Sequence, residues 1–327
     1  MAETIVFERR RCYPPENAMN LTHRLINNVQ KVLLGKPQAV RLAVTCFLAE
    51  GHLLIDDIPG VGKTTLALAL AKSIGVGFQR IQFTSDLLPS DLLGVSVYSP
   101  KTQSFDFKPG PLFHHVVLAD EINRASPKTQ SALLEAMQEK QITIDNLTHT
   151  LPAPFFVIAT QNPHEHHGTF ALPESQMDRF LMRLELGYPS EDAETAILRG
   201  DSIQPPVTHL DTVSNASEVT AEIEKIRGVA VDESLDRYIV QIAKKSRESS
   251  MVDLGLSPRG TIALRRAAQA YASSEDRTYV IPDDIKAVAP AVAAHRLRLK
   301  GSHYNGESPQ AADEIVREIL GHVSVPV

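Results

Sequence analysis

The stretch HLLIDDIPGVGKTTLALALAKSIG, residues 52–75, decides the fold that this sequence predicts. It begins with a short apolar run typical of a buried strand, and it ends with strong helix formers that stop at a glycine. The loop between them finishes with Gly62, Lys63 and Thr64, as the phosphate-binding pattern G-x-x-x-x-G-K-[ST] requires. Asp57 stands where that pattern has its first glycine. A strand, a glycine loop and a helix in this order nevertheless predict a nucleotide-binding site.

The residues of this loop have distinct expected roles. Gly60 and Gly62 permit a tight turn, because glycine adopts positive φ angles without steric cost, and backbone N–H groups can then point at phosphate oxygens. Lys63 would reach the β- and γ-phosphates of ATP, and the Thr64 hydroxyl would bind Mg²⁺, so ATP and Mg²⁺ are the predicted cofactors. On the loop alone, an ordinary glycine–proline turn before a helix is the alternative. The residues predicted to contact the nucleotide here are Pro59, Gly60, Val61, Gly62, Lys63, Thr64 and Thr65.

The whole chain has the composition of a globular protein of roughly two domains, with 327 residues, 43% hydrophobic and 22% charged. Its net charge of −6 disfavours a nucleic-acid surface, although it leaves room for a local basic patch. Cys12 and Cys46 are the only cysteines, and no C-x-x-C motif is present, which favours a reducing compartment. We find no pattern of a signal peptide and no apolar stretch of membrane-spanning length. We therefore expect a cytoplasmic protein without membrane insertion.

Four further apolar runs are typical of strands, and helical patterns separate most of them. They span residues 78–84, 115–120, 155–160 and 180–186. This alternation predicts an α/β fold with a mostly parallel sheet and helices on both faces. Residues 141–151 alternate around Asp145 and Asn146, which predicts an inserted hairpin. Because the later patterns are mostly helical, we predict an α/β nucleotide-binding domain over residues 1–190 and a small helical domain over residues 191–327.

A second motif, VVLADEINRA at residues 116–125, supports the nucleotide site. Its apolar strand delivers Asp120 and Glu121 at the carboxyl end, where ligands bind in open α/β sheets. Asp120 is expected to hold Mg²⁺, directly or through water, and Glu121 to polarise an attacking water. Two adjacent carboxylates could instead form a solvated strand end. Their combination with Lys63 and Thr64 favours the nucleotide site.

Three more polar residues are candidates for the same chemistry. Asn162 follows another apolar strand and could hydrogen-bond the attacking water or the γ-phosphate, although an Asn-Pro turn is the plainer interpretation. Arg179 lies just before the last predicted strand and would be useful as an arginine finger in a neighbouring subunit. The alternative for Arg179 is a salt bridge with Asp178 or Glu174. Arg259 follows Ser-Pro in the first turn of a helix, where a cation is unfavourable unless an anion compensates it; an ordinary surface arginine is its alternative.

Longer stretches resemble the MoxR family of AAA+ ATPases, and the resemblance extends from about residue 17 to residue 300. They are FTSDLLPSDLLGVSVY (83–98), KPGPLFHHVVLADEINRASPKTQSALLEAMQE (108–139), FFVIATQNP (155–163), GTFALPESQMDRF (168–180) and LGLSPRG (254–260). The resemblance implies a P-loop AAA+ core with a parallel five-stranded sheet in the order 5-1-4-3-2, followed by a small all-α lid domain.

By position, the resemblance also assigns roles to individual residues. The family's Walker A motif falls on residues 57–65, its Walker B motif on Asp120 and Glu121, its sensor 1 on Asn162, its arginine finger on Arg179 and its sensor 2 on Arg259. The stretch VLLGK, residues 32–36 with Gly35, matches the segment that lines the adenine pocket in such proteins. The family is similar to magnesium-chelatase ATPase subunits. Its members are thought to act as chaperone-like machines with von Willebrand factor A domain partners, often in metal insertion or complex assembly.

The loop after sensor 1 departs from the family's pattern because it carries extra histidines. His164, His166 and His167 flank Glu165 and could form a metal site, but this loose spacing without a cysteine or second cluster favours a loop facing solvent or a partner. His114 and His115 precede the Asp120 strand and are interpreted as structural.

Together these observations predict a Mg²⁺-dependent ATPase that acts as a ring, implied to be a hexamer, on an unknown protein client. In each site Lys63, Thr64 and Asp120 would hold phosphates and metal. Arg259 would link the γ-phosphate to the position of the lid. One rival is a nucleic-acid motor, which the acidic charge balance and the absence of a basic and aromatic stretch in residues 141–151 disfavour. The other is a nucleotide-gated scaffold without hydrolysis, which the intact Glu121 disfavours.

Overall fold

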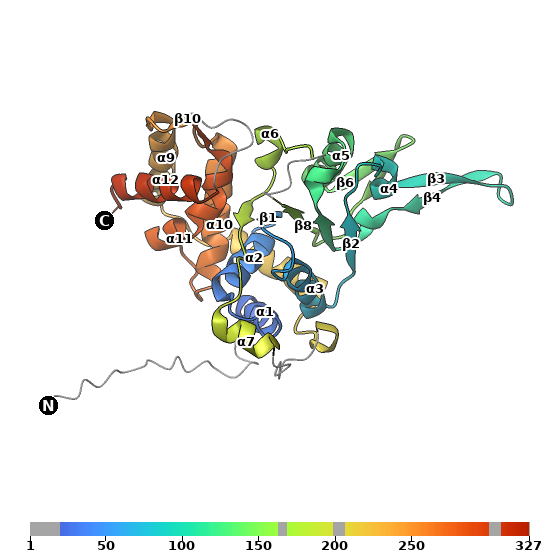
Figure 1. Ribbon diagram of the computed structural model, residues 1–327, viewed down its shortest axis with the longest axis horizontal. Helices are drawn as coiled ribbons and strands as arrows, with labels where there is room; N and C mark the ends of the chain where they lie inside the picture. Colours follow the sequence, from blue (N-terminus) through green and yellow to red (C-terminus); the bar gives the residue numbers. More distant parts are fainter. Residues whose placement is uncertain (1–19, 163–168, 199–206, 301–308, 327) are drawn as a thin grey trace.

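A five-stranded parallel sheet forms the centre of the first half of the chain (Figure 1). The computed structural model describes residues 20–162, 169–198, 207–300 and 309–326. The strands of the sheet are β1 (Leu53–Asp56), β2 (Phe78–Gln82), β5 (Val116–Asp120), β8 (Phe156–Gln161) and β9 (Met182–Leu184). They lie in the order β2-β5-β8-β1-β9, and every neighbouring pair is parallel. Counted along the chain, the five strands read 5-1-4-3-2 from the β9 edge. The α/β fold with a parallel five-stranded sheet is thereby confirmed.

Helices cover both faces of the sheet, as the alternation of its apolar side chains requires. Leu53 and Ile55 belong to the core cluster with α1 (Leu21–Gln30), α2 (Pro37–Leu48) and α3 (Lys63–Ile74). Leu54 points to the other face. There it joins a second cluster with the short helix α4 (Pro89–Leu93) and with α5 (Pro127–Glu139).

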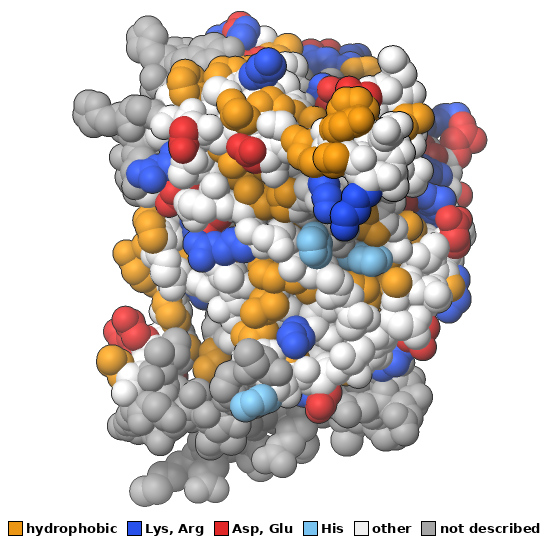
Figure 2. All heavy atoms as spheres, turned by 90° about the vertical axis from the view of Figure 1, so that its right-hand side faces the viewer, with side chains coloured by type: hydrophobic (Ala, Val, Ile, Leu, Met, Phe, Trp, Pro, Cys, Tyr) orange, Lys and Arg blue, Asp and Glu red, His pale blue; other side chains and the backbone are white. Residues whose placement is uncertain are grey.

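Within the described residues, two hairpins extend from the sheet domain. The predicted hairpin of residues 141–151 is present as β6 (Gln141–Ile144) and β7 (Leu147–Thr150), and both residues of its turn have positive φ angles. A second hairpin, β3 (Gly94–Ser99) with β4 (Ser104–Pro109), was not predicted, and it projects far from the body (Figure 1). Figure 2 faces this end of the molecule and shows hydrophobic side chains interspersed with charged ones.

The second half of the chain is mostly helical and packs on the sheet domain. Its helices are α8 (Ala216–Arg227), α9 (Glu233–Glu248), α10 (Pro258–Ser273), α11 (Pro282–Ala293) and α12 (Pro309–His322). The expectation that it is all helical is wrong in one detail, because β10 (Val252–Leu254) and β11 (Arg298–Leu299) form a small antiparallel sheet. These segments are only three and two residues long, too short to leave a recognisable alternation.

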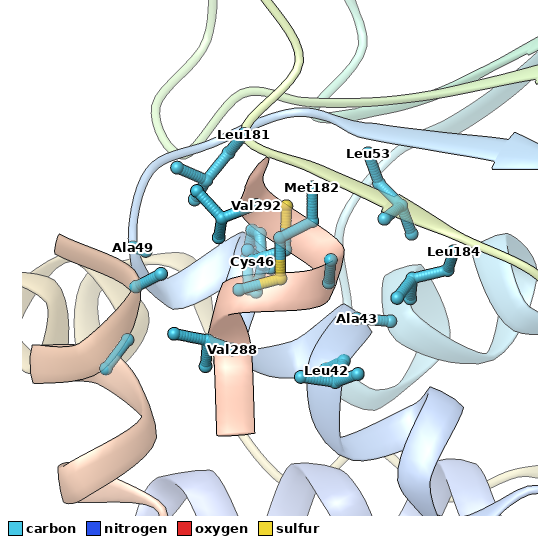
Figure 3. Packing of buried hydrophobic residues seen from close by; sticks show 14 of the residues in the cluster. Leu42, Ala43, Cys46, Ala49, Leu53, Leu181, Met182, Leu184, Val288 and Val292 are labelled. Atoms are coloured by element: carbon cyan, nitrogen blue, oxygen red, sulfur yellow. The ribbon is translucent and has the colours of Figure 1, made fainter. Parts of the chain in front are cut away.

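Buried side chains join the two halves. Cys46 of α2 and Met182 of β9 lie near Val288 and Val292 of α11, and all four belong to one cluster (Figure 3). Burial raises the pKa of the Cys46 thiol, so that this cysteine behaves as a small apolar side chain.

Two described parts of the chain after β9 lie against the sheet domain. Ser190 and Ala193, at the start of α7 (Glu191–Leu198), lie beside Gly35, and a short turn of 3₁₀ helix (Val207–His209) contacts α3. Asn28 of α1 donates to the carbonyl oxygen of Asp211 at 2.8 Å. A domain boundary at residue 190 remains a prediction. In the described ranges, no helix combines the length and apolar character that crossing a membrane requires.

The buried His52 lies just before β1 and links two elements of the sheet domain. Its Nδ1 accepts from the N–H of Val157 and its Nε2 donates to the carbonyl oxygen of Met137, each at 3.1 Å, so the neutral ring joins β8 to α5. Burial lowers the pKa of His52 to about 4, because the charged imidazolium is poorly solvated there.

We expect the protein to lose stability as the pH falls from about 6.5 towards 4. The unfolded chain protonates this histidine near pH 6.5, whereas the folded chain resists until about pH 4, so acid favours unfolding throughout that interval and has no further effect through His52 below it. The lost stability is on the order of 3 kcal/mol. Urea unfolding at several pH values should detect it, and His52→Gln should show a shallower pH dependence. An equally steep dependence in that variant would contradict the assignment.

Candidate functional site

The predicted phosphate-binding loop lies between β1 and α3, at the carboxyl ends of the strands. Gly60 and Gly62 have φ angles of +88° and +102°, which L-residues rarely adopt, and α3 begins at Lys63. The N–H groups of the first turn of α3 therefore face the loop without helical partners. This is the geometry that binds anions at helix N-termini.

Asp57 has a structural role that explains why the first glycine of the motif is absent. Its side chain is only 8% exposed. One carboxylate oxygen accepts from the N–H of Leu186 at 2.6 Å and of Gly187 at 2.7 Å, and the other accepts from the N–H of Ile58 at 2.8 Å. Asp57 therefore ties the start of the loop to the segment after β9. Lys36 reinforces this connection, since its ammonium donates to the carbonyl oxygens of Leu186, at 2.6 Å, and Gly187.

A cavity of about 310 Å³ opens above the loop. Its lining residues are Pro59, Gly60, Gly62, Lys63, Thr64, Thr65, Arg80, Asp120, Glu121 and Asn162. The structure thus brings together most of the predicted nucleotide, metal and catalytic residues. Val61 does not line this cavity and is buried, with 6% exposure. Gly35 also lies outside it, beside Ser190 and Ala193 at the start of α7.

The two carboxylates at the end of β5 are held in fixed positions. Asp120 accepts from the Thr160 hydroxyl at 2.6 Å and from Arg80 Nη2 at 2.6 Å. Glu121 accepts from Gln82 Nε2 at 2.7 Å and has a φ angle of +57°. The Thr160 hydroxyl also accepts from the N–H of Glu121 at 2.9 Å. The contacts with Gln82 and Thr160 therefore orient Glu121.

The donor set fits a magnesium nucleotide. The Thr64 hydroxyl and the Asp120 carboxylate lie in the same cavity as the loop, and Mg²⁺ prefers such oxygen ligands together with phosphates. Lys63 donates to the carbonyl oxygen of Asp57 at 2.5 Å. Burial lowers the pKa of Lys63, while the nearby carboxylates, Asp57 first, raise it. Lys63 is thus a cation already directed towards the phosphate loop.

Sequence reasoning missed Arg80, Gln82 and Thr160. Arg80 and Gln82 alternate along β2, and the register pairs Gln82 with Asp120 on the neighbouring strand. The sequence signal of Arg80 and Gln82 is a pair of polar side chains on one face of a strand. This pair indicates a site only when the strand order shows that β2 lies next to β5.

Arg179 and Arg259 lie elsewhere, in a second cavity of about 310 Å³. This cavity includes Gly51 and His52, at the beginning of β1, whereas the phosphate loop follows the end of β1. The proposed salt bridges of Arg179 are not formed, because Asp178 pairs with Arg296 at 2.6 Å and Glu174 pairs with Arg298 at 3.3 Å. The role predicted for Arg259, linking the γ-phosphate to the lid, stays a prediction, and Arg259 does not line the cavity of the phosphate loop in its own chain. Arg259 lies on α10 and lines the cavity of Arg179 instead.

The extra histidines at positions 164, 166 and 167, with Glu165, lie outside the described residues, as does Cys12. Within the described ranges, no cluster of three or more His, Cys, Asp or Glu side chains could hold a metal ion. His114 supports its structural interpretation, since its Nδ1 lies 3.0 Å from the carbonyl oxygen of Pro111.

Comparisons with known proteins agree with this geometry. The family described as "ATPase family associated with various cellular activities (AAA)" matches residues 52–182, and the AAA lid domain family matches residues 244–319. A crystal structure of a candidate ATPase from Cytophaga hutchinsonii is 37% identical, has a TM-score of 0.84, and the match covers 94% of this chain and 96% of that one. The fold and the site thus define an AAA+ ATPase domain with its lid.

Curated relatives narrow this class further. Chaperone MoxR1 of Mycobacterium tuberculosis is 36% identical over 96% of this chain and 86% of its own length. Protein MoxR of Methylorubrum extorquens is 30% identical over 93% of this chain and 94% of its own length. Uncharacterized protein YeaC of Bacillus subtilis is 48% identical over 95% of this chain and 97% of its own length. The chain belongs to the MoxR family of AAA+ ATPases.

Proposed function

We propose that this protein binds ATP with Mg²⁺, hydrolyses it, and uses the cycle to remodel or mature a protein partner. The observation that carries the proposal is the cavity in which Lys63, Thr64, Asp120, Glu121 and Asn162 meet above the phosphate loop. A cation, two metal ligands, a base and a polar amide at one point are the groups that phosphoryl transfer to water requires.

Each of these groups has a task in the proposed reaction. Lys63 and the loop N–H groups bind the phosphates, and Thr64 and Asp120 would hold Mg²⁺, which supplies positive charge at the phosphate oxygens. Glu121 accepts a proton from the attacking water as that water approaches the γ-phosphorus. Asn162, at the end of the neighbouring strand β8, orients the same water. The arginines needed to neutralise the transition state come from another copy.

The positions of the arginines favour a ring. Arg179 precedes β9 and lies near the beginnings of the strands, whereas Asp120 ends β5 and Glu121 follows it in the same parallel sheet. One chain would therefore offer its phosphate site on one side and its arginines on another. Contacts of this head-to-tail kind close into rings when the rotation allows. The family resemblance favours six subunits.

The biological role is proposed from relatives and from the resemblance. One relative is named a chaperone, which supports a chaperone-like action on a protein client. We propose a von Willebrand factor A domain protein as the partner, on the family resemblance alone. The buried, free thiol of Cys46 fits a reducing location such as the cytoplasm.

Replacing Lys63 by alanine tests the proposed nucleotide site. We expect Lys63→Ala to lose most of its affinity for a fluorescent ATP analogue, because the ammonium group proposed to bind the phosphates is gone. Lys72→Ala is the matched control, since Lys72 is exposed in the last turn of the same helix. The wild-type protein should hydrolyse ATP only when Mg²⁺ is supplied. Equal affinity in the two variants would remove the basis of the proposal.

A further inference from the structure

The cavity that holds Arg179 and Arg259 has a large excess of positive charge. Its cationic side chains are Lys140, Arg179, Arg227, Arg259, Arg266 and Arg296. Among the residues that the structure describes, only two carboxylates, Glu50 and Asp178, line the same cavity. Both carboxylates already have partners, because Glu50 pairs with Lys140 at 2.9 Å and with Arg227, and Asp178 pairs with Arg296 at 2.6 Å.

Three arginines are left without compensation. Arg179, Arg259 and Arg266 form no side-chain hydrogen bond or ion pair with any residue in the described part of the chain. The three unpaired guanidinium groups repel one another, and an anion bound among them would relieve this repulsion. The sequence patterns indicate a function for the first two of these residues but not for Arg266.

Arg266 shares a face of α10 with Arg259. The two residues are two helical turns apart, a rise of about 10 Å, with Ile262 between them and 55% exposed. The neighbouring Arg265 differs, since its Nε donates to Asp236 of α9 at 2.7 Å and it does not line this cavity. The unpaired face of the helix is therefore formed by Arg259, Ile262 and Arg266.

We propose that Arg266 is a third anion-binding residue, and that its ligand is the polyphosphate of a nucleotide held by a second copy of this chain. This inference rests on the proposed function, because the second copy must present a loaded phosphate loop. Charge complementarity supports the choice of ligand. In the cavity around Lys63, the cations Lys63 and Arg80 balance Asp120 and Glu121, so bound ATP would make it anionic, and one loaded copy would offer a polyphosphate where the next offers unpaired arginines. Long guanidinium side chains two turns apart suit an extended polyphosphate better than a single carboxylate.

The test compares Arg266→Gln with Arg265→Gln, which removes the same charge one position away. We expect Arg266→Gln to keep the wild-type affinity of its own loop for a fluorescent ATP analogue. Its ATP hydrolysis should fall about 10-fold to 100-fold, as expected for one lost hydrogen bond to a charged group. Its ATP-dependent self-association in analytical ultracentrifugation should weaken as well. Arg266→Lys should recover part of both losses, and Arg265→Gln should resemble the wild type.

Other outcomes separate this inference from the proposed function. Equal hydrolysis and equal self-association in the wild type and in Arg266→Gln would overturn the role of Arg266, and so would a loss of affinity at the variant's own loop. Wild-type protein that self-associates with ATP but never hydrolyses it would refute the proposed reaction alone. In that case weaker assembly of Arg266→Gln would still support the inference, and unchanged assembly would overturn it.

Discussion

Glu121→Gln should bind ATP as the wild type does and hydrolyse it about 10²–10⁴ times more slowly. The substitution preserves the shape of the side chain but removes the carboxylate that accepts a proton from water. Thr64, Lys63 and Asp120 remain, so the groups that hold phosphates and Mg²⁺ are unchanged.

The contacts around Glu121 should persist in this variant, so the variant tests the hydrolysis step and not the local structure. Its side chain is held by Gln82 and lies 3.3 Å from Arg124, and its backbone is held through Thr160. A glutamine oxygen can still accept from Gln82, so the local structure should persist. Affinity for an ATP analogue and steady-state phosphate release are the two measurements. Glu135→Gln, an exposed position on α5, is the control. Hydrolysis at the wild-type rate in Glu121→Gln would assign the base to another residue.

The site residues that follow strands were the easiest to predict. A parallel sheet collects the carboxyl ends of its strands at one edge, so Lys63, Asp120 and Asn162 had to lie near one another once the strands were recognised. Short-range sequence patterns were sufficient to predict this proximity, because each residue is placed by its own strand and all the strands run in the same direction.

Residues whose role depends on distant segments could not be predicted in the same way. Asp57 departs from the loop pattern, yet its carboxylate accepts from the N–H groups of Leu186 and Gly187, about 130 positions later. Arg80 acquires its meaning only because β2 lies beside β5. The cavity that Arg259 lines could not be predicted from the sequence, because no local pattern encodes how the helical half packs on the sheet domain.

Arg179→Ala should bind ATP normally and lose most of its hydrolysis. Arginine fingers contribute roughly 10³–10⁵ in rate, or about 4–7 kcal/mol of transition-state stabilisation. Arg179 does not line the cavity of its own phosphate loop, so its removal should leave the affinity of that loop for ATP unchanged. Arg237→Ala serves as the control, because Arg237 is an exposed arginine whose partner is Glu233 of the same helix. Surface pairs of that kind contribute only about 0–1 kcal/mol.

Mixing two inactive variants then tests whether the finger acts between subunits. Arg179→Ala retains an intact phosphate loop, and Lys63→Ala retains an intact finger. In a mixed ring, some interfaces join the intact phosphate loop of an Arg179→Ala subunit to the intact Arg179 of a Lys63→Ala subunit. Such an interface contains every catalytic group, so part of the ATPase activity should return when subunits exchange. A finger that acted within its own chain could not be supplied in this way, because no single polypeptide in the mixture carries both residues. Mixed assemblies that form, as seen by differently labelled subunits, but stay inactive would therefore exclude the ring mechanism, and near-normal activity of Arg179→Ala alone would exclude the finger itself.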